Sequence, residues 1–294
     1  MKNILLVTGG AGFIGSNLIE KLIKLKKFKI ISLDNYSSGK ISNHIKNSRV
    51  RYLKDDTKNI ENLLNSYKNR IHTIFHFGEF ARIFQSFKKI NECFSSNIEG
   101  TLNVFQFALK NKIKLIYSAT SASLGNKGND KNLSPYAFAK HNNLELLENY
   151  KKWFNFKYEI IYFYNVYGPK QICKGDMATV VGIFEECFRS KKKMPVVRPG
   201  LQSRRFTHVN DTVEACIFAW KKNKKLHYSI ASNKSYSIVQ LANMFKRKIR
   251  YLPERKGERF SSALNRMNLN NKIIKLSARI KIKDYVNNFL KNNC

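Results

Sequence analysis

The chain has 294 residues, 43% hydrophobic and 13% aromatic, which excludes a disordered protein and allows one large domain or two smaller ones. Its formal net charge is +34, but lysine is spread along the whole sequence, so we interpret the charge as a solvated surface that attracts anionic substrates rather than a specific nucleic-acid site. No apolar run is as long as a membrane helix requires, about 18 residues, and the N-terminal apolar segment is too short for a secretory signal. We therefore expect a cytoplasmic protein without membrane insertion.

The cysteines and histidines suggest neither a disulfide framework nor a metal site. The cysteines are odd in number and widely spaced, at Cys93, Cys173, Cys187, Cys216 and Cys294. No C-x-x-C pair occurs, and the six histidines lack metal-ligand spacing. We expect reduced thiols and no bound metal.

The first half of the chain alternates short apolar runs with helical periods. The pattern predicts strands at 3–9, 29–35, 73–78, 114–120 and 158–168, and helices at 15–26, 60–69 and 95–111. Strands that alternate with helices form right-handed βαβ units around a parallel sheet. This part of the sequence therefore predicts an α/β fold with a doubly wound parallel sheet.

The second half has a looser pattern, in which loops with Gly and Pro separate helical segments. Helices are predicted at 177–190, 211–222 and 237–248. We expect a first domain over residues 1–167 and a smaller, mostly helical cap over 168–294. Segments between about residues 205 and 235 are expected to return to the first domain.

A glycine motif follows the first predicted strand and opens the first predicted helix. Gly9, Gly12 and Gly15 form G-x-x-G-x-x-G, with Phe13 and Ile14 between the last two. Such glycines allow a tight turn and let the backbone approach a pyrophosphate at a helix N-terminus. These residues predict a Rossmann-type dinucleotide site.

An acid at the end of the second strand bears on which dinucleotide binds. Asp34 comes 19 residues after Gly15, where a carboxylate binds ribose hydroxyls and repels a 2′-phosphate. It favours NAD and leaves NADP open, because Lys40 is close in sequence. We expect Asn35 beside it to contact the cofactor. Asp56 is a candidate adenine contact and, equally, a candidate helix N-cap.

A second set of residues indicates catalysis. Tyr136 and Lys140 are one helical turn apart, and Thr120 ends the strand that precedes them. A tyrosine titrates at about 10, which is too high for a base at neutral pH, but a neighbouring ammonium lowers that pKa. Tyr136 is then the base that takes a hydroxyl proton while hydride leaves the same carbon. Lys140 tunes it and holds the nicotinamide ribose, and Thr120 binds the reacting oxygen.

This combination resembles the extended short-chain dehydrogenase/reductase family, in particular its NAD-dependent nucleotide-sugar epimerases and dehydratases. The similarity covers the chain almost end to end, with further matches at 74–78, 97–105, 164–169, 200–211 and 254–259. Residues 74–78 lie where the family usually has a His-Leu-Ala-Ala run. The resemblance implies a nucleotide-sugar substrate and a homodimer.

The resemblance also implies residues for both ligands. Asn97 is expected at the cofactor, Asn165 at the substrate, and Arg204 and Arg255 at its diphosphate, since a guanidinium matches phosphate oxygens. The chain departs from the family at Arg205, which replaces the usual Asp. It also departs at Glu79 and Arg82, which are expected near the nicotinamide and the sugar entrance without an assigned role.

The positions after Thr120 favour epimerisation. Dehydratases of the family typically carry Asp-Glu there, and related decarboxylases keep a Glu two places on, whereas this chain has Ser121 and Ala122. The leading hypothesis is an epimerase of the UDP-glucose 4-epimerase type. One alternative is an ADP-glycero-manno-heptose 6-epimerase, in which Lys174 would be a second base. Another dehydratase or reductase of nucleotide sugars, and a non-catalytic NAD(P)- or RNA-binding relative, are further alternatives.

The resemblance places the dimer contact in a four-helix bundle. The helices at about 95–110 and 138–154 are the candidates, and their apolar residues are Phe105, Phe107, Leu144 and Leu147. These side chains equally suit packing against the protein's own sheet.

Overall fold

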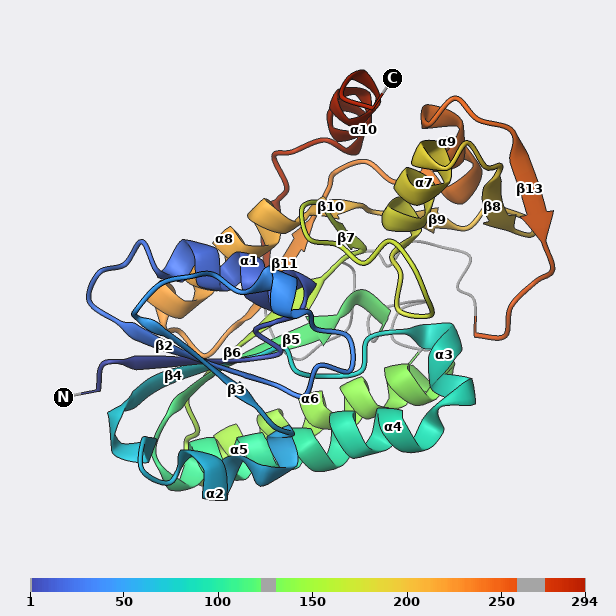
Figure 1. Ribbon diagram of the computed structural model, residues 1–294. Helices are drawn as coiled ribbons and strands as arrows, with labels where there is room; N and C mark the ends of the chain where they lie inside the picture. Colours follow the sequence, from blue (N-terminus) through green and yellow to red (C-terminus); the bar gives the residue numbers. More distant parts are fainter. Residues whose placement is uncertain (1, 123–130, 258–272, 294) are drawn as a thin grey trace.

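The computed structural model describes residues 2–122, 131–257 and 273–293. A parallel sheet lies between two helical layers, with a smaller cap beside it (Figure 1). The strands lie in the order β14 (Ile273–Ser277), β11 (His227–Ala231), β6 (Tyr158–Phe163), β5 (Lys114–Thr120), β4 (Ile71–His76), β1 (Ile4–Thr8), β2 (Lys29–Asp34) and β3 (Val50–Lys54). Every adjacent pair is parallel. The predicted doubly wound α/β fold is confirmed.

Helices cover both faces of this sheet, so its central strands are buried throughout. One face packs against α1 (Phe13–Leu22) and α8 (Val209–Lys222). The other packs against α2 (Ile60–Leu64), α5 (Thr101–Lys110) and α6 (Pro135–Phe154). Side chains alternate along β1: Leu5 joins the core under α1 and α8, while Leu6 joins the core on the opposite face. This double cover explains the continuous apolar runs in the sequence.

Short helical segments lead into the layer of α5 and α6. Two α-helices, α3 (Ile83–Lys88) and α4 (Ile90–Phe94), follow β4, and a π-helical stretch, η4 (Ser95–Gly100), continues into α5. The 3₁₀ turns are η1 (Ile41–Asn43), η2 (Thr57–Asn59) and η3 (Lys68–Arg70).

The cap has its own apolar core, in which Phe184, Leu241 and Val286 are fully buried. Its helices are α7 (Val180–Arg189), α9 (Ile238–Met244) and α10 (Ile282–Lys291). Its paired strands are β8 (Met194–Val197) with β13 (Ile249–Leu252), and β9 (Ser203–Arg204) with β12 (Tyr236–Ser237). A further pair, β7 (Val166–Tyr167) and β10 (Thr207–His208), connects it to the sheet domain. The division at residue 167 stays a prediction.

The apolar residues considered for a dimer contact lie in the core between α5, α6 and the sheet. Phe105, Phe107, Leu144 and Leu147 are at most 7% exposed and belong to one cluster with the strand residues. They therefore pack against the protein's own sheet and supply no surface for a partner. The homodimer itself stays a prediction.

Two further expectations bear on the environment of the chain. Among the described helices, none is both long and apolar enough to span a membrane. Four cysteines are free thiols, at Cys93, Cys173, Cys187 and Cys216, and Cys294 lies outside the described residues. The cytoplasmic location stays a prediction.

Candidate active site

A cleft of about 650 Å³ lies between the sheet domain and the cap. The carboxyl ends of β1, β4 and β5 meet at its floor, where the strand order reverses between β1 and β4. This position is the usual ligand site of an open parallel sheet, because loops diverge there and leave a crevice. The cleft brings together the glycine loop, Thr120, Tyr136, Lys140, Asn165 after β6 and the cap residues Arg204 and Arg255.

The glycine loop is shaped by close backbone contacts. Gly9 has φ +68°, and a Cβ there would lie 2.8 Å from the backbone of Phe77 and Gly78. A Cβ on Gly15 would lie 2.2 Å from the Gly9 carbonyl oxygen. Gly12 caps α1 without a side chain, and α1 has no acid in its first turn. The helix N-terminus therefore fits the pyrophosphate of a dinucleotide. Phe13 and Ile14 also line the cleft.

Asp34 and Asn35 lie at the edge of the cleft where β2 ends. One Asp34 oxygen accepts a hydrogen bond from the backbone N–H of Ala11 at 2.9 Å, and the other accepts from Tyr36 at 2.8 Å. Burial raises the pKa of the Asp34 carboxyl, and these bonds oppose the rise. The carboxylate is thus fixed beside the glycine loop, where it fits a ribose diol.

Two predicted cofactor residues do not line the cleft, and a neighbour of each does. Asp56 caps the η2 turn by accepting from the Lys58 N–H at 3.0 Å, while Asp55 lines the cleft. Asn97 is fully buried and holds the backbone of Phe80 through bonds of 2.6 and 2.8 Å. Ser96 lines the cleft instead. Asp56 therefore takes the helix-cap role that the sequence left open, and Asn97 supports the loop after β4.

Tyr136 lies in the first turn of α6 and lines the cleft. Ser134 caps this helix and accepts a hydrogen bond from the Ala137 N–H at 3.1 Å, with Pro135 as its first residue. The Tyr136 N–H donates to the hydroxyl of Ser86 on α3 at 3.3 Å. Lys140 follows one turn later and donates to the Ser118 carbonyl at 2.5 Å. Thr120 lines the cleft, and its hydroxyl accepts from the Ala122 N–H at 3.1 Å.

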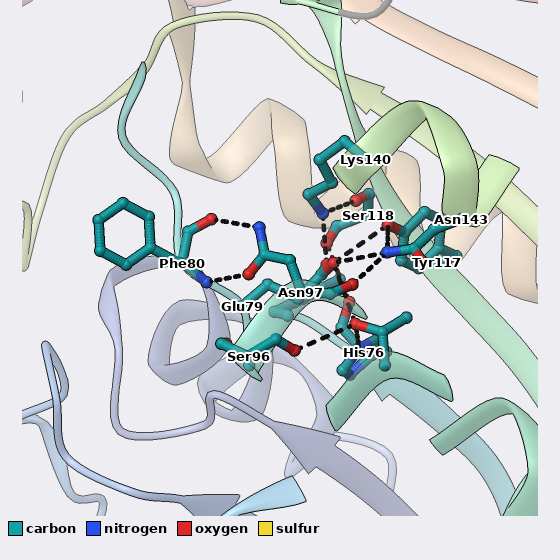
Figure 2. Close-up of polar contacts among 12 residues, drawn as sticks. His76, Glu79, Phe80, Ser96, Asn97, Tyr117, Ser118, Lys140 and Asn143 are labelled. Atoms are coloured by element: carbon teal, nitrogen blue, oxygen red, sulfur yellow. Dashed lines mark hydrogen bonds and ion pairs between the residues drawn. The ribbon is translucent and has the colours of Figure 1, made fainter. Parts of the chain in front are cut away.

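Lys140 also forms a buried ion pair with Glu79 (Figure 2). The exposed fraction of the side chain is 5% for Lys140 and 2% for Glu79. The sequence singled out Glu79 without a role. It could not predict the ion pair, because 61 residues separate Glu79 from Lys140. The lysine predicted to act in catalysis is therefore paired with a carboxylate inside the protein.

The substrate candidates differ in where the structure places them. Asn165 has φ +35° and lines the cleft, as do Arg204 and Arg255. Arg255 lies 5.1 Å from the centroid of the Phe84 ring. Lys174 does not line the cleft: it is 76% exposed and pairs with Glu186 at 3.0 Å. Residues 258 and 259, the end of the matching segment 254–259, lie outside the described residues.

Arg82 ties the start of α3 to the loop before α7. Its Nε donates to the Met177 carbonyl at 3.0 Å, and Nη2 donates to the same oxygen. Both residues line the cleft, and the guanidinium interacts electrostatically with Tyr136. Arg82 is therefore a cation on the Tyr136 side of the cleft.

Comparison with known proteins agrees with this geometry. The model of the NAD dependent epimerase/dehydratase family matches residues 5–231. The ADP-L-glycero-D-manno-heptose-6-epimerase of Brachyspira hyodysenteriae is 28% identical, with 83% of this chain and 80% of that protein covered. The UDP-N-acetyl-alpha-D-glucosaminuronate decarboxylase of Bacillus cytotoxicus is 31% identical, with coverages of 82% and 79%.

Solved structures show the same similarity in three dimensions. The UDP-glucose 4-epimerase of Thermotoga maritima, determined with UDP-glucose, superposes with a TM-score of 0.86. It is 26% identical, and the match covers 98% of this chain and 97% of that one. The family similarity inferred from the motifs is confirmed, with NAD as the family's cofactor. The chain belongs to the NAD-dependent epimerase/dehydratase family.

Proposed function

We propose that the protein is a nucleotide-sugar epimerase of the UDP-glucose 4-epimerase type. One observation carries the proposal: Thr120, Tyr136 and Lys140 line the same cleft as the glycine loop, while Ser121 and Ala122 follow Thr120. The first three move a proton beside a dinucleotide. The last two provide no carboxylate at the position where a dehydratase keeps its acids.

The chemistry follows from the positions of these side chains. NAD, when bound, accepts a hydride from the sugar carbon and returns it to the other face of the transient ketone. The Tyr136 phenolate oxygen takes the proton of the sugar hydroxyl and gives it back after the ketone has turned. The Thr120 hydroxyl orients the reacting oxygen. The Lys140 ammonium stabilises the phenolate through its charge and holds the nicotinamide ribose.

Three further cleft residues supply groups that suit the rest of the substrate. Arg204 and Arg255 offer guanidinium groups to a diphosphate, and Asn165 offers an amide to its oxygens or to the sugar. The net charge of +34 favours the approach of such an anion. The UDP-glucose in the Thermotoga maritima structure supports a uridine diphosphate sugar as the first substrate to test.

The test is incubation of the purified protein with a panel of UDP-, GDP-, ADP- and dTDP-sugars. We expect one carbon to be inverted without net oxidation or reduction, observed by NMR of the sugar. A dehydrated 4-keto-6-deoxy product would overturn the epimerase proposal. Inversion of an ADP-heptose alone would instead support the 6-epimerase, which the Brachyspira hyodysenteriae relative represents.

A pair of tyrosine variants on α6 makes the test specific. Tyr136→Phe removes the proposed base and should reduce turnover by about 10²–10⁴-fold, the usual contribution of a general base. Tyr150→Phe removes the hydroxyl of a tyrosine on the same helix that packs in the sheet-facing core and lies outside the cleft lining. It should leave turnover unchanged. Equal losses in both variants would indicate damage to the helix rather than loss of a base.

A further inference from the structure

We propose that Glu79 is a positioning residue that keeps Lys140 protonated and thereby sets the pH range in which Tyr136 works. The inference rests on the proposed function, because it concerns the same tyrosine–lysine pair. It goes beyond the family pattern, from which this chain departs at Glu79.

Glu79 follows β4 at the floor of the cleft, and protein groups occupy both of its oxygens (Figure 2). Lys140 contacts Oε2. Oε1 accepts hydrogen bonds from the Tyr117 hydroxyl at 3.1 Å, the Thr101 hydroxyl at 3.2 Å and the Asn143 amide at 3.4 Å. Four donors from β5, α5 and α6 thus hold the carboxylate. It is therefore built to act on the lysine rather than to carry a proton to a sugar.

Lys140 needs a counter-ion because burial has removed its water. Its other contacts are neutral: the Ser118 carbonyl at 2.5 Å and the face of the Tyr117 ring, whose centroid is 4.7 Å from Nζ. Burial lowers the pKa of the Lys140 ammonium, and Glu79 raises it. An uncharged lysine would no longer stabilise the Tyr136 phenolate. Glu79 therefore preserves the charge on which the tyrosine depends.

The groups around the pair do not supply a second anion at neutral pH. Burial lowers the pKa of His76 to about 4, so this ring is neutral. Burial raises the pKa of the Cys93 thiol to about 12 and that of Tyr117 well above its ordinary value. The other described groups in contact with Glu79 or Lys140 are uncharged: the Thr101 hydroxyl, the Tyr117 side chain and the Asn143 amide. Arg82, directly before α3, is a cation that interacts electrostatically with Tyr136. Among the described residues in contact with Lys140, Glu79 is the one carboxylate.

The sign of the effect follows from the charge. Removing an anion lowers the pKa of every group that it faces. The Tyr136 phenolate then forms at lower pH, and Lys140 loses its proton at lower pH. A bell-shaped pH profile with these groups as its acid and alkaline limbs moves as a whole toward acid.

The experiment compares pH–rate profiles of Glu79→Gln and Glu79→Asp with the unaltered protein, using the panel sugar that is turned over. We expect both limbs to move by about one pH unit or more in Glu79→Gln, a typical effect of a nearby charge. Glu79→Asp keeps the charge and should restore both limbs. Glu79→Ala is the second variant if the glutamine variant fails to fold, because it also removes the charge, and it should shift the profile in the same direction.

A matched control removes another buried glutamate that faces a lysine. Glu159 on β6 is fully buried, lies 3.5 Å from Lys114 and does not line the cleft. Glu159→Gln should lower the stability of the fold and leave the pH profile in place. A shift of both limbs in this control, or none in Glu79→Gln, would overturn the assignment of Glu79.

A second readout does not depend on turnover. The ultraviolet absorbance of tyrosinate is titrated in the protein, and the same titration of Tyr136→Phe is subtracted. The Tyr136 signal should appear at lower pH in the Glu79→Gln background. If no sugar is turned over but this signal shifts, the proposed function fails and the role of Glu79 stands. If a sugar is epimerised while signal and profile stay in place, the role of Glu79 fails and the function stands.

Discussion

The carboxylate of Asp34 accepts a hydrogen bond from the backbone N–H of Ala11 at 2.9 Å, and this bond joins the end of β2 to the glycine loop. A second bond, from the Tyr36 N–H at 2.8 Å, fixes the other oxygen. The acid proposed to select the cofactor is therefore positioned by the loop proposed to receive the pyrophosphate. A change at Asp34 acts on both parts of the dinucleotide site.

The first prediction concerns cofactor choice. Asp34→Asn keeps the side-chain volume but removes the charge, so its bonds to backbone and ribose weaken and a 2′-phosphate is no longer repelled. We expect NAD affinity to fall about tenfold or more, since a charge-assisted hydrogen bond contributes roughly 1.5–3 kcal/mol. NADP affinity should fall less or rise. Calorimetric titration with both dinucleotides measures this.

The control for this prediction is Asp56→Asn. Asp56 caps the η2 turn, accepts a hydrogen bond from the Asn35 amide at 3.0 Å and does not line the cleft, so its substitution should change both affinities much less than Asp34→Asn does. A loss of NAD affinity equal to that of Asp34→Asn would support the adenine contact that the sequence suggested for Asp56.

The second prediction separates two glycines of the loop. A Cβ on Gly15 would lie 2.2 Å from the Gly9 carbonyl, so Gly15→Ala forces the backbone apart. Overpacking of this kind costs about 1–3 kcal/mol, and we expect the Tm to fall by several degrees. A Cβ on Gly12 would meet only the Gly9 oxygen, at 3.1 Å. Gly12→Ala should therefore keep most of the stability and lose NAD binding, because the methyl group would occupy the place that we propose for the pyrophosphate. Equal Tm losses in both variants would contradict this distinction.

The sequence predicted those parts of the molecule that depend on local spacing. Short apolar runs separated by segments of helical period predict the parallel sheet, because each pattern indicates which face of a strand or helix is buried. The glycine spacing likewise places Gly9 and Gly15 against each other within one turn. Tyr136 and Lys140 share a helix face because they are four residues apart.

The remaining features depend on contacts between distant segments. Glu79 meets Lys140 across 61 residues, and only the tertiary fold brings the loop after β4 to the first turns of α6. Asp55 and Asp56 are adjacent after β3, so a shift of one position decides which side chain lines the cleft and which caps the η2 turn. Lys174 lies in a segment that resembles the heptose epimerases, but its side chain pairs with Glu186 on α7, and the sequence does not predict that contact.

The third prediction concerns stability at low pH. His76 is fully buried, its ring contacts the hydroxyls of Thr8 and Thr101 at 2.7 and 3.0 Å, and burial lowers its pKa to about 4. The unfolded chain binds a proton at this histidine below about pH 6.5, and the folded protein does so only below about pH 4. Stability from this residue is therefore lost as pH falls through that window, by roughly 2 kcal/mol between pH 8 and pH 5.

Urea unfolding at these two pH values measures the effect. His76→Gln should be less stable at pH 8, since it loses well-formed contacts, and should lose less additional stability on acidification. The control is His141→Gln on α6, a residue that pairs with Glu145 at the surface. Its pH dependence should match that of the unaltered protein. An unchanged pH dependence in His76→Gln would exclude this histidine as the cause.

The fourth prediction distinguishes the two epimerase types. Lys174→Ala removes an exposed side chain whose ion pair with Glu186 lies outside the cleft lining, and such surface pairs contribute about 0–1 kcal/mol. We expect turnover of the identified sugar to change by less than about twofold, because the Lys174 side chain lies outside the cleft and its surface ion pair contributes little. Lys140→Ala is the positive control and should abolish turnover, since it removes the charge that stabilises the Tyr136 phenolate. A hundredfold loss in Lys174→Ala with an ADP-heptose would show that the loop turns inward when substrate binds and that Lys174 is the second base of a 6-epimerase.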